Sequence, residues 1–115
     1  MKAQVEIISI DNKELINVDN IINKNHFSYT DLDGASNEID ILDDGIKVHR
    51  ISKDHETNLY LSQNERSFIE IKTEEGVINI DTKTLAFNVN NDIISIAYII
   101  EGSETNKIVI KYIGA

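Results

Sequence analysis

The feature that most constrains the fold of this chain is an alternation of apolar and polar residues with a period of two. Successive side chains of a β-strand point to opposite faces of a sheet, so this alternation is typical of strands with one buried face. No stretch shows the sustained period of about 3.6 residues that indicates a helix. The sequence therefore predicts an all-β protein.

About ten strands are expected, joined by short turns rich in Asp, Asn, Glu and Gly. We expect the strands at residues 3–10, 15–23, 26–31, 38–42, 45–52, 57–63, 67–73, 77–90, 93–101 and 106–112. In 77–90 the alternation changes phase at Thr82-Lys83-Thr84, which indicates a bulge or a sharp bend. Short connections of this kind predict one antiparallel up-and-down meander, closed as a barrel or folded as a sandwich.

Length, charge and composition narrow the class of protein. The 115 residues fit a single domain, 1–115, and the absence of cysteine excludes disulfides and thiolate zinc sites. A net charge of −9 disfavours nucleic acid and anionic membranes, whose binding begins with cations on phosphate. The apolar run 93–100 is far shorter than the roughly 20 residues of a membrane span, and no apolar leader follows Met1. We therefore expect a cytoplasmic protein with no nucleic-acid or membrane partner.

The stretch DLDGASNEIDILDDG, residues 31–45, is the most acidic part of the chain. An EF-hand calcium loop requires glycine at position 6 and an acid at position 12, but Gly34 stands at position 4 and Leu42 at position 12. We interpret the stretch as a turn at Asp33-Gly34, a strand, and a hairpin turn at Asp44-Gly45.

The chain offers no constellation of residues suited to catalysis or to metal binding. Its histidines, His26, His49 and His55, stand singly, without the spacing of a metal pair. Nucleophile motifs and phosphate-binding glycine loops are also missing from the sequence. We expect no catalytic residue, no metal site and no cofactor.

Arg50 is unusual because it shares the apolar face of its strand with Ile46 and Val48. A buried guanidinium requires an acid or an anion, and Asp31 lies on the same face as Phe27 and Tyr29. One interpretation is an internal Arg50–Asp31 ion pair that plugs one end of a barrel. The other is an arginine that recognises an anion or a carboxylate inside a ligand cavity.

The runs FSYTDLDGASNEIDILDDGIKVHRI, TNLYLSQNERSFIEIKTEEG and TKTLAF resemble the YwiB-like family of small bacterial proteins of unknown function. The resemblance covers about residues 25–113 and rests on a spaced pattern of positions. These positions are Tyr29, Asp31, Gly34, Arg50, Thr73, Gly76 and Tyr98. The chain departs from the family at Glu74-Glu75, where Pro-Tyr is usual, and at Ser52, which replaces a common glycine. The resemblance implies a calycin-like β-barrel and no particular reaction.

Together these features predict an antiparallel meander of about 8–10 strands, closed as a calycin- or lipocalin-like barrel. We expect a non-catalytic binding module for a small, partly apolar or anionic ligand inside the barrel. The candidate ligand-binding residues are Tyr29, Asp31, Arg50, Thr73 and Tyr98. The alternative is a structural or protein-interaction module with a packed interior and no ligand; the oligomeric state is left open.

Overall fold

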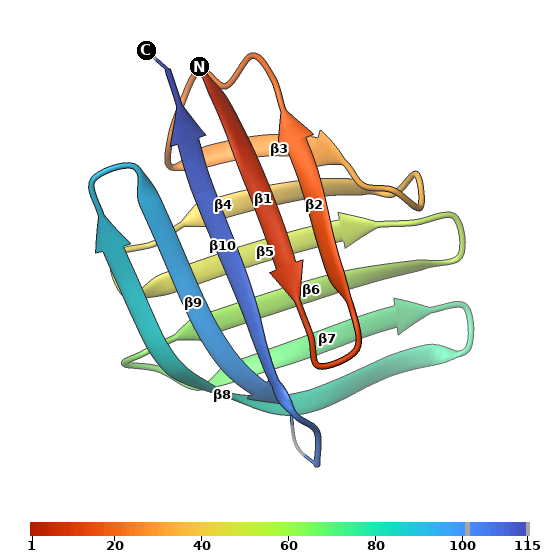
Figure 1. The fold of residues 1–115 in the computed structure, drawn as a ribbon. Helices are drawn as coiled ribbons and strands as arrows, with labels where there is room; N and C mark the ends of the chain where they lie inside the picture. Colours follow the sequence, from red (N-terminus) through yellow and green to blue (C-terminus); the bar gives the residue numbers. More distant parts are fainter. Residues whose placement is uncertain (101, 115) are drawn as a thin grey trace.

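A computed structural model describes residues 1–100 and 102–114, and within them the chain forms ten β-strands and no helix (Figure 1). The strands are β1 (Lys2–Ile8), β2 (Lys13–Val18), β3 (His26–Thr30), β4 (Ser36–Ile41), β5 (Gly45–Ile51), β6 (His55–Ser62), β7 (Ser67–Thr73), β8 (Gly76–Asn90), β9 (Ile93–Ile100) and β10 (Thr105–Ile113). All the pairings between them are antiparallel, so the predicted all-β meander is confirmed.

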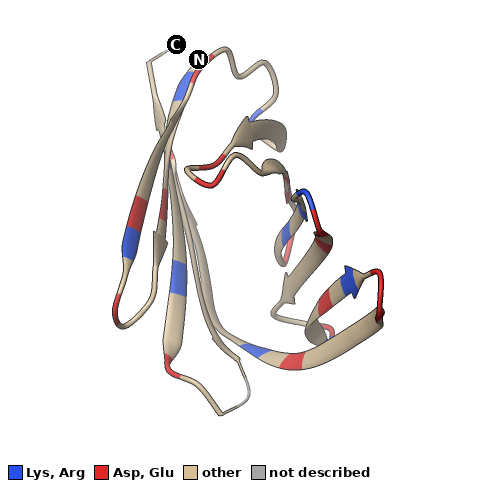
Figure 2. Cartoon of the chain, turned by 90° about the vertical axis from the view of Figure 1, so that its right-hand side faces the viewer, with Lys and Arg blue, Asp and Glu red and all other residues tan. Residues whose placement is uncertain are grey.

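The ten strands form one sheet in the order β2-β1-β10-β9-β8-β7-β6-β5-β4-β3. Strands that follow one another in the chain are neighbours in the sheet, except β2 and β3. Because β1 pairs with β10 as well as with β2, β2 and β3 are the two ends of the sheet. The sheet curls until its halves face each other (Figure 2). The sheet therefore forms a nearly closed barrel, as the meander predicted from the sequence implies.

The long strand β8 turns the corner between the two halves. Its first part pairs with β7 and its second part with β9, and the register shifts between Thr84 and Ala86 (Figure 1). The extra residue, Leu85, is half exposed. The bend predicted from the phase change is thus present, and the bulge follows directly after the predicted triplet.

Side chains from both halves of the sheet fill the interior. The largest fully buried side chains lie on strands of both halves: Val5, Ile39, Ile46, Leu61, Ile96 and Ile110. On β1, β4 and β9 their positions follow the period of two, with less buried residues between the buried ones.

The chain between β2 and β3 differs from the prediction of a strand at residues 15–23. β2 ends at Val18, and Asn20 has a φ of 58°, a left-handed conformation that interrupts an extended strand. The segment that follows crosses the upper end of the barrel in Figure 1. Ile21 is buried there and its N–H donates to the carbonyl of Met1, while the neighbouring Ile22 is 97% exposed.

Gly45 also has a different role from the predicted one. It is the first residue of β5, and it is buried. A Cβ atom at this position would lie 1.7 Å from the carbonyl oxygen of Leu61. The position needs glycine because two backbones approach closely, not because the chain turns there.

Candidate functional site

A row of polar side chains crosses the inner face of the sheet at one end of β3–β6. In the strand register Tyr29 faces Asn37, Asn37 faces Arg50, and Arg50 faces Thr57. Alternation places all four on the side of the core residues Ile39 and Ile46. The inner face of the sheet therefore carries a polar band at this end.

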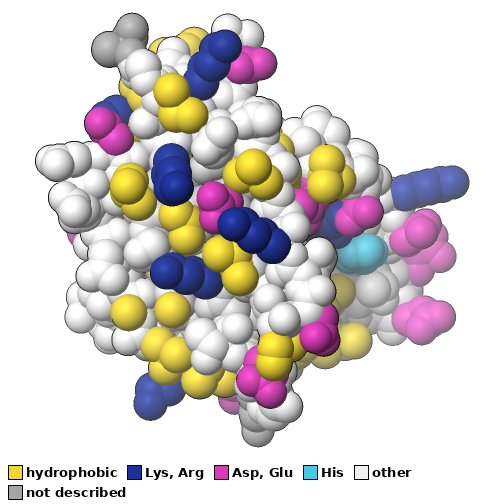
Figure 3. Space-filling model, in the orientation of Figure 1, with side chains coloured by type: hydrophobic (Ala, Val, Ile, Leu, Met, Phe, Trp, Pro, Cys, Tyr) yellow, Lys and Arg dark blue, Asp and Glu magenta, His cyan; other side chains and the backbone are white. Residues whose placement is uncertain are grey.

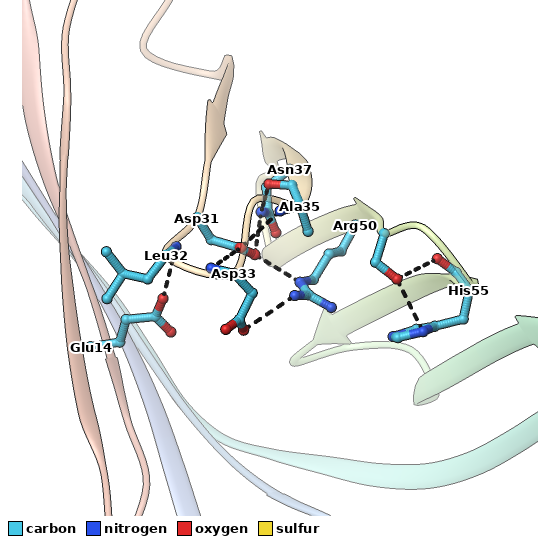
Figure 4. A network of polar contacts seen from close by, with 9 residues as sticks. Glu14, Asp31, Leu32, Asp33, Ala35, Asn37, Arg50 and His55 are labelled. Atoms are coloured by element: carbon cyan, nitrogen blue, oxygen red, sulfur yellow. Dashed lines mark hydrogen bonds and ion pairs between the residues drawn. The ribbon is translucent and has the colours of Figure 1, made fainter.

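The ion pair between Arg50 and Asp31, expected from strand alternation, is present. The Nε–H of Arg50 donates to Oδ2 of Asp31 at 2.8 Å, and the Nδ2 amide of Asn37 donates to the same oxygen at 2.9 Å (Figure 4). The backbone N–H groups of Asp33 and Ala35 both donate to Oδ1 at 3.0 Å. Asp31 thus accepts four hydrogen bonds, and it orders the turn that follows β3 as well as holding Arg50.

Hydrogen bonding keeps Asp31 ionised although its side chain is only 7% exposed. Desolvation by burial would raise the pKa of the carboxyl, but the hydrogen bonds from Arg50, Asn37 and the Ala35 amide outweigh it and lower the pKa from 3.8 to about 2. The carboxylate therefore carries its negative charge throughout the neutral range.

Two further acids lie near the guanidinium. Nη2 of Arg50 is 3.5 Å from Oδ2 of Asp33, whose side chain is 82% exposed. Glu14, on β2 at the other end of the sheet, accepts a hydrogen bond of 3.4 Å from the N–H of Leu32 (Figure 4). The turn between β3 and β4 thereby bridges the gap between the two end strands.

A cavity of about 150 Å³ lies inside this end of the barrel. Tyr29, Arg50 and Tyr98 line it, so three of the five candidate ligand-binding residues are brought together around one cavity. Its other walls are Ile7, Asn37, Ile39, Val48, Thr57, Leu59 and Ile108. The surface is mainly apolar, and among the described residues that line it Arg50 is the only one with an ionised side chain.

The two tyrosines of the cavity stay protonated well above neutral pH. Burial is the largest cause that raises the pKa of Tyr29, followed by the negative charges of Asp31 and Glu14. Burial also raises the pKa of Tyr98. Neither hydroxyl makes a hydrogen bond with another residue in 1–100 or 102–114. Both are therefore neutral groups that are free to donate or accept.

Thr73 and Asp31 do not line the cavity. Thr73 lies at the exposed end of β7, where its hydroxyl donates to the carbonyl of Gly76 and accepts from the N–H of Glu75. Its place in the spaced pattern shared with the YwiB-like family made it a candidate, but the strand extends past the barrel interior there. Asp31 supports Arg50 from the adjoining turn.

The sequence interpretation missed Asn37 and Thr57, which flank Arg50 on the neighbouring strands. Asn37 is 3% exposed and its amide reaches both Asp31 and the carbonyl of Ala35. Both could have been found from the pairing of neighbouring strands, since each residue faces Arg50 directly across a hairpin.

The structure adds no metal site to this picture. Within the part of the chain that it describes, no three His, Asp or Glu side chains are grouped so that they could hold a metal ion. The acidic stretch 31–45 forms the turn at 31–35, strand β4 and the connection at 42–44. The same described part contains no helix able to cross a membrane.

Comparison with known proteins gives a likeness of fold. No family model and no curated protein matches the sequence. The crystal structure of the YwiB protein from Bacillus subtilis is similar, with a TM-score of 0.57 and 17% sequence identity over 98% of this chain and 89% of that chain. The resemblance to YwiB-like proteins that was inferred from the sequence is thus confirmed at the level of the fold.

Proposed function

We propose that the protein is a non-catalytic binding module that holds a small, partly apolar ligand in the cavity beside Arg50. The observation that carries the proposal is the cavity itself, which has apolar walls and three polar side chains, Tyr29, Arg50 and Tyr98. Binding sites for small molecules commonly combine a mainly apolar surface with a few placed polar groups.

The volume limits the ligand. Pockets for drug-sized molecules measure roughly 300–1,000 Å³. At about 150 Å³ this cavity is smaller, and a protein cavity of that order accepts a molecule of benzene size. A cavity of this volume can therefore hold a ligand of about six to nine non-hydrogen atoms.

The alternative is a structural or protein-interaction module with no ligand. In its favour, the deeper interior is packed, with Ile39, Ile46 and Leu61 at most 1% exposed. Such a module would present an apolar surface to its partner. On the face shown in Figure 3, however, the hydrophobic side chains are spread among charged ones and do not form one continuous patch. On this face, therefore, no broad apolar surface is presented to a partner.

We also propose that the barrel is calycin-like and that the protein is cytoplasmic without nucleic-acid or membrane partners. The meander with an internal cavity supports the first point. The net charge of −9 supports the exclusion of phosphate-rich partners.

The test is the binding of benzene, followed by two-dimensional amide NMR of the labelled protein. Binding should shift the amides of β4, β5 and β9 around the cavity. Val48→Phe, which places a ring in the cavity, should abolish these shifts, whereas Val89→Phe, the same change at a position 59% exposed on β8, should leave them intact. If benzene shifts no cavity amide of the wild-type protein, the packed-module alternative is correct. If benzene does bind, native mass spectrometry of protein purified from its own host would identify a retained natural ligand.

A further inference from the structure

The charges around Arg50 restrict the chemistry of the ligand. The guanidinium is paired with Asp31 at 2.8 Å and has Asp33 at 3.5 Å. The negative charge of Glu14 also acts on Arg50. One positive charge is thus surrounded by three negative ones, and this end of the barrel is negative on balance.

A carboxylate or phosphate would have to enter against that field. It would compete for Arg50 with Asp31, whose position three other donors already fix: the amides of Asp33 and Ala35 and the side chain of Asn37. Displacing Asp31 would leave a buried carboxylate without its cation, and sharing Arg50 would bring two like charges together. An anionic ligand is therefore disfavoured.

The cavity nevertheless offers hydrogen-bond donors. A guanidinium has five N–H donors, and Nε is the only nitrogen of Arg50 that makes a hydrogen bond within residues 1–100 and 102–114. The hydroxyls of Tyr29 and Tyr98 add two more donors from opposite halves of the sheet. An uncharged oxygen acceptor can use these donors without disturbing the Arg50–Asp31 pair.

We propose that the ligand is an uncharged carbonyl compound, with its oxygen toward Arg50 and Tyr98 and its apolar part against Ile39, Leu59 and Ile108. This inference rests on the proposed function and selects the neutral class of ligand over the anionic one.

Acetophenone and benzoate test the proposal because they have the same number of non-hydrogen atoms and differ in charge. Benzene serves as the apolar reference. Titrations at pH 7, followed through the Nε–H signal of Arg50, should give a dissociation constant at least tenfold lower for acetophenone than for benzoate. The Nε–H of Arg66, in an exposed pair with Asp81, is the internal control and should not move.

Two variants test separately how the Tyr98 hydroxyl and the negative charge of Asp31 affect binding. Tyr98→Phe should raise the dissociation constant of acetophenone several-fold and leave that of benzene unchanged. Asp31→Asn keeps an oxygen for the Asp33 and Ala35 amides but removes the negative charge. It should lower the dissociation constant of benzoate relative to that of acetophenone.

The outcomes distinguish this inference from the proposed function. Benzoate binding as tightly as acetophenone, or acetophenone binding no better than benzene, would overturn the inference and leave the binding module standing. Failure of all three probes to bind would overturn both.

Discussion

Replacing Asp31 with alanine should destabilise the protein more than replacing its partner Arg50, although the two form one ion pair. Asp31→Ala removes the acceptor of four donors: the amides of Asp33 and Ala35, Nδ2 of Asn37 and Nε of Arg50. Since the carboxylate is 7% exposed and Asn37 is 3% exposed, its loss leaves at least the Asn37 amide without a partner where water has little access. Removing one partner of a buried pair costs about 3–5 kcal/mol of the free energy of unfolding.

Arg50→Ala is expected to cost less. Asp31 would keep three of its four donors, and the Arg50 side chain is 27% exposed, so water can replace part of the lost contact. The loss of one hydrogen bond between charged groups corresponds to about 1.5–3 kcal/mol. In the double variant the two losses should not add, and the coupling should be about 1–3 kcal/mol.

Urea unfolding followed by far-UV circular dichroism measures these free energies. Urea is preferred to guanidinium chloride because it is uncharged and does not screen ion pairs. Arg66→Ala is the matched control, since Arg66 pairs with Asp81 on the surface with side chains 73% and 62% exposed. An exposed pair of this kind contributes at most about 1 kcal/mol.

Equal urea midpoints for Arg50→Ala and Arg66→Ala would refute the reasoning. So would a coupling between Arg50 and Asp31 below about 0.5 kcal/mol, which is the range of independent sites. Either result would mean that Asp31 is held by its turn alone and that Arg50 adds nothing to the stability of the barrel.

The remaining predictions concern pH, glycine and calcium. Because hydrogen bonds lower the pKa of Asp31 from 3.8 to about 2, roughly 2 kcal/mol of stability should be present above pH 4 and lost as the pH falls toward 2. Urea midpoints of Asp31→Asn should lack this part of the pH dependence. Gly45→Ala should lower the melting temperature far more than Gly34→Ala. A Cβ at position 45 would lie 1.7 Å from the carbonyl oxygen of Leu61, whereas a Cβ at position 34 would meet open space and cause only backbone strain, at a φ of 83°. Calcium in tenfold excess over a micromolar site should leave the melting temperature unchanged, and a rise of several degrees would reveal a site in residues 31–45.

Strand alternation predicted the inner face of β5, and with it the ion pair. The prediction succeeded because the period of two leaves no freedom: once Ile46 and Val48 face the core, Arg50 must as well. The same rule placed Tyr29 on the inner face of β3, with Asp31 on the same side just past the end of that strand. These are local inferences within single strands, and the structure bears them out.

What depends on long-range pairing could not be predicted in this way. Nothing in the alternation indicates that β1 pairs with β10 as well as with β2, which makes β2 and β3 the ends of the sheet. Nor does it show how far a strand extends beyond the interior, so the exposed position of Thr73 at the end of β7 was not predicted. Asn20 adopts a left-handed backbone conformation, and Gly45 lies where two strands approach closely. Neither feature can be inferred from residue type alone.

Asp31 connects the shape of one end of the barrel to its electrostatics. Its Oδ1 atom holds the turn at 31–35, and its Oδ2 atom holds Arg50, which lines the cavity. The same turn reaches across to Glu14 on β2 through the N–H of Leu32 (Figure 4). Two neighbouring strands in a ladder lie about 4.8 Å apart with regular backbone hydrogen bonds. Between β2 and β3 no such ladder is formed, and this turn and its side chains span the gap instead. The residues that bridge the open seam of the barrel are therefore the ones that set the charge at the cavity, so a change in the turn would alter both together.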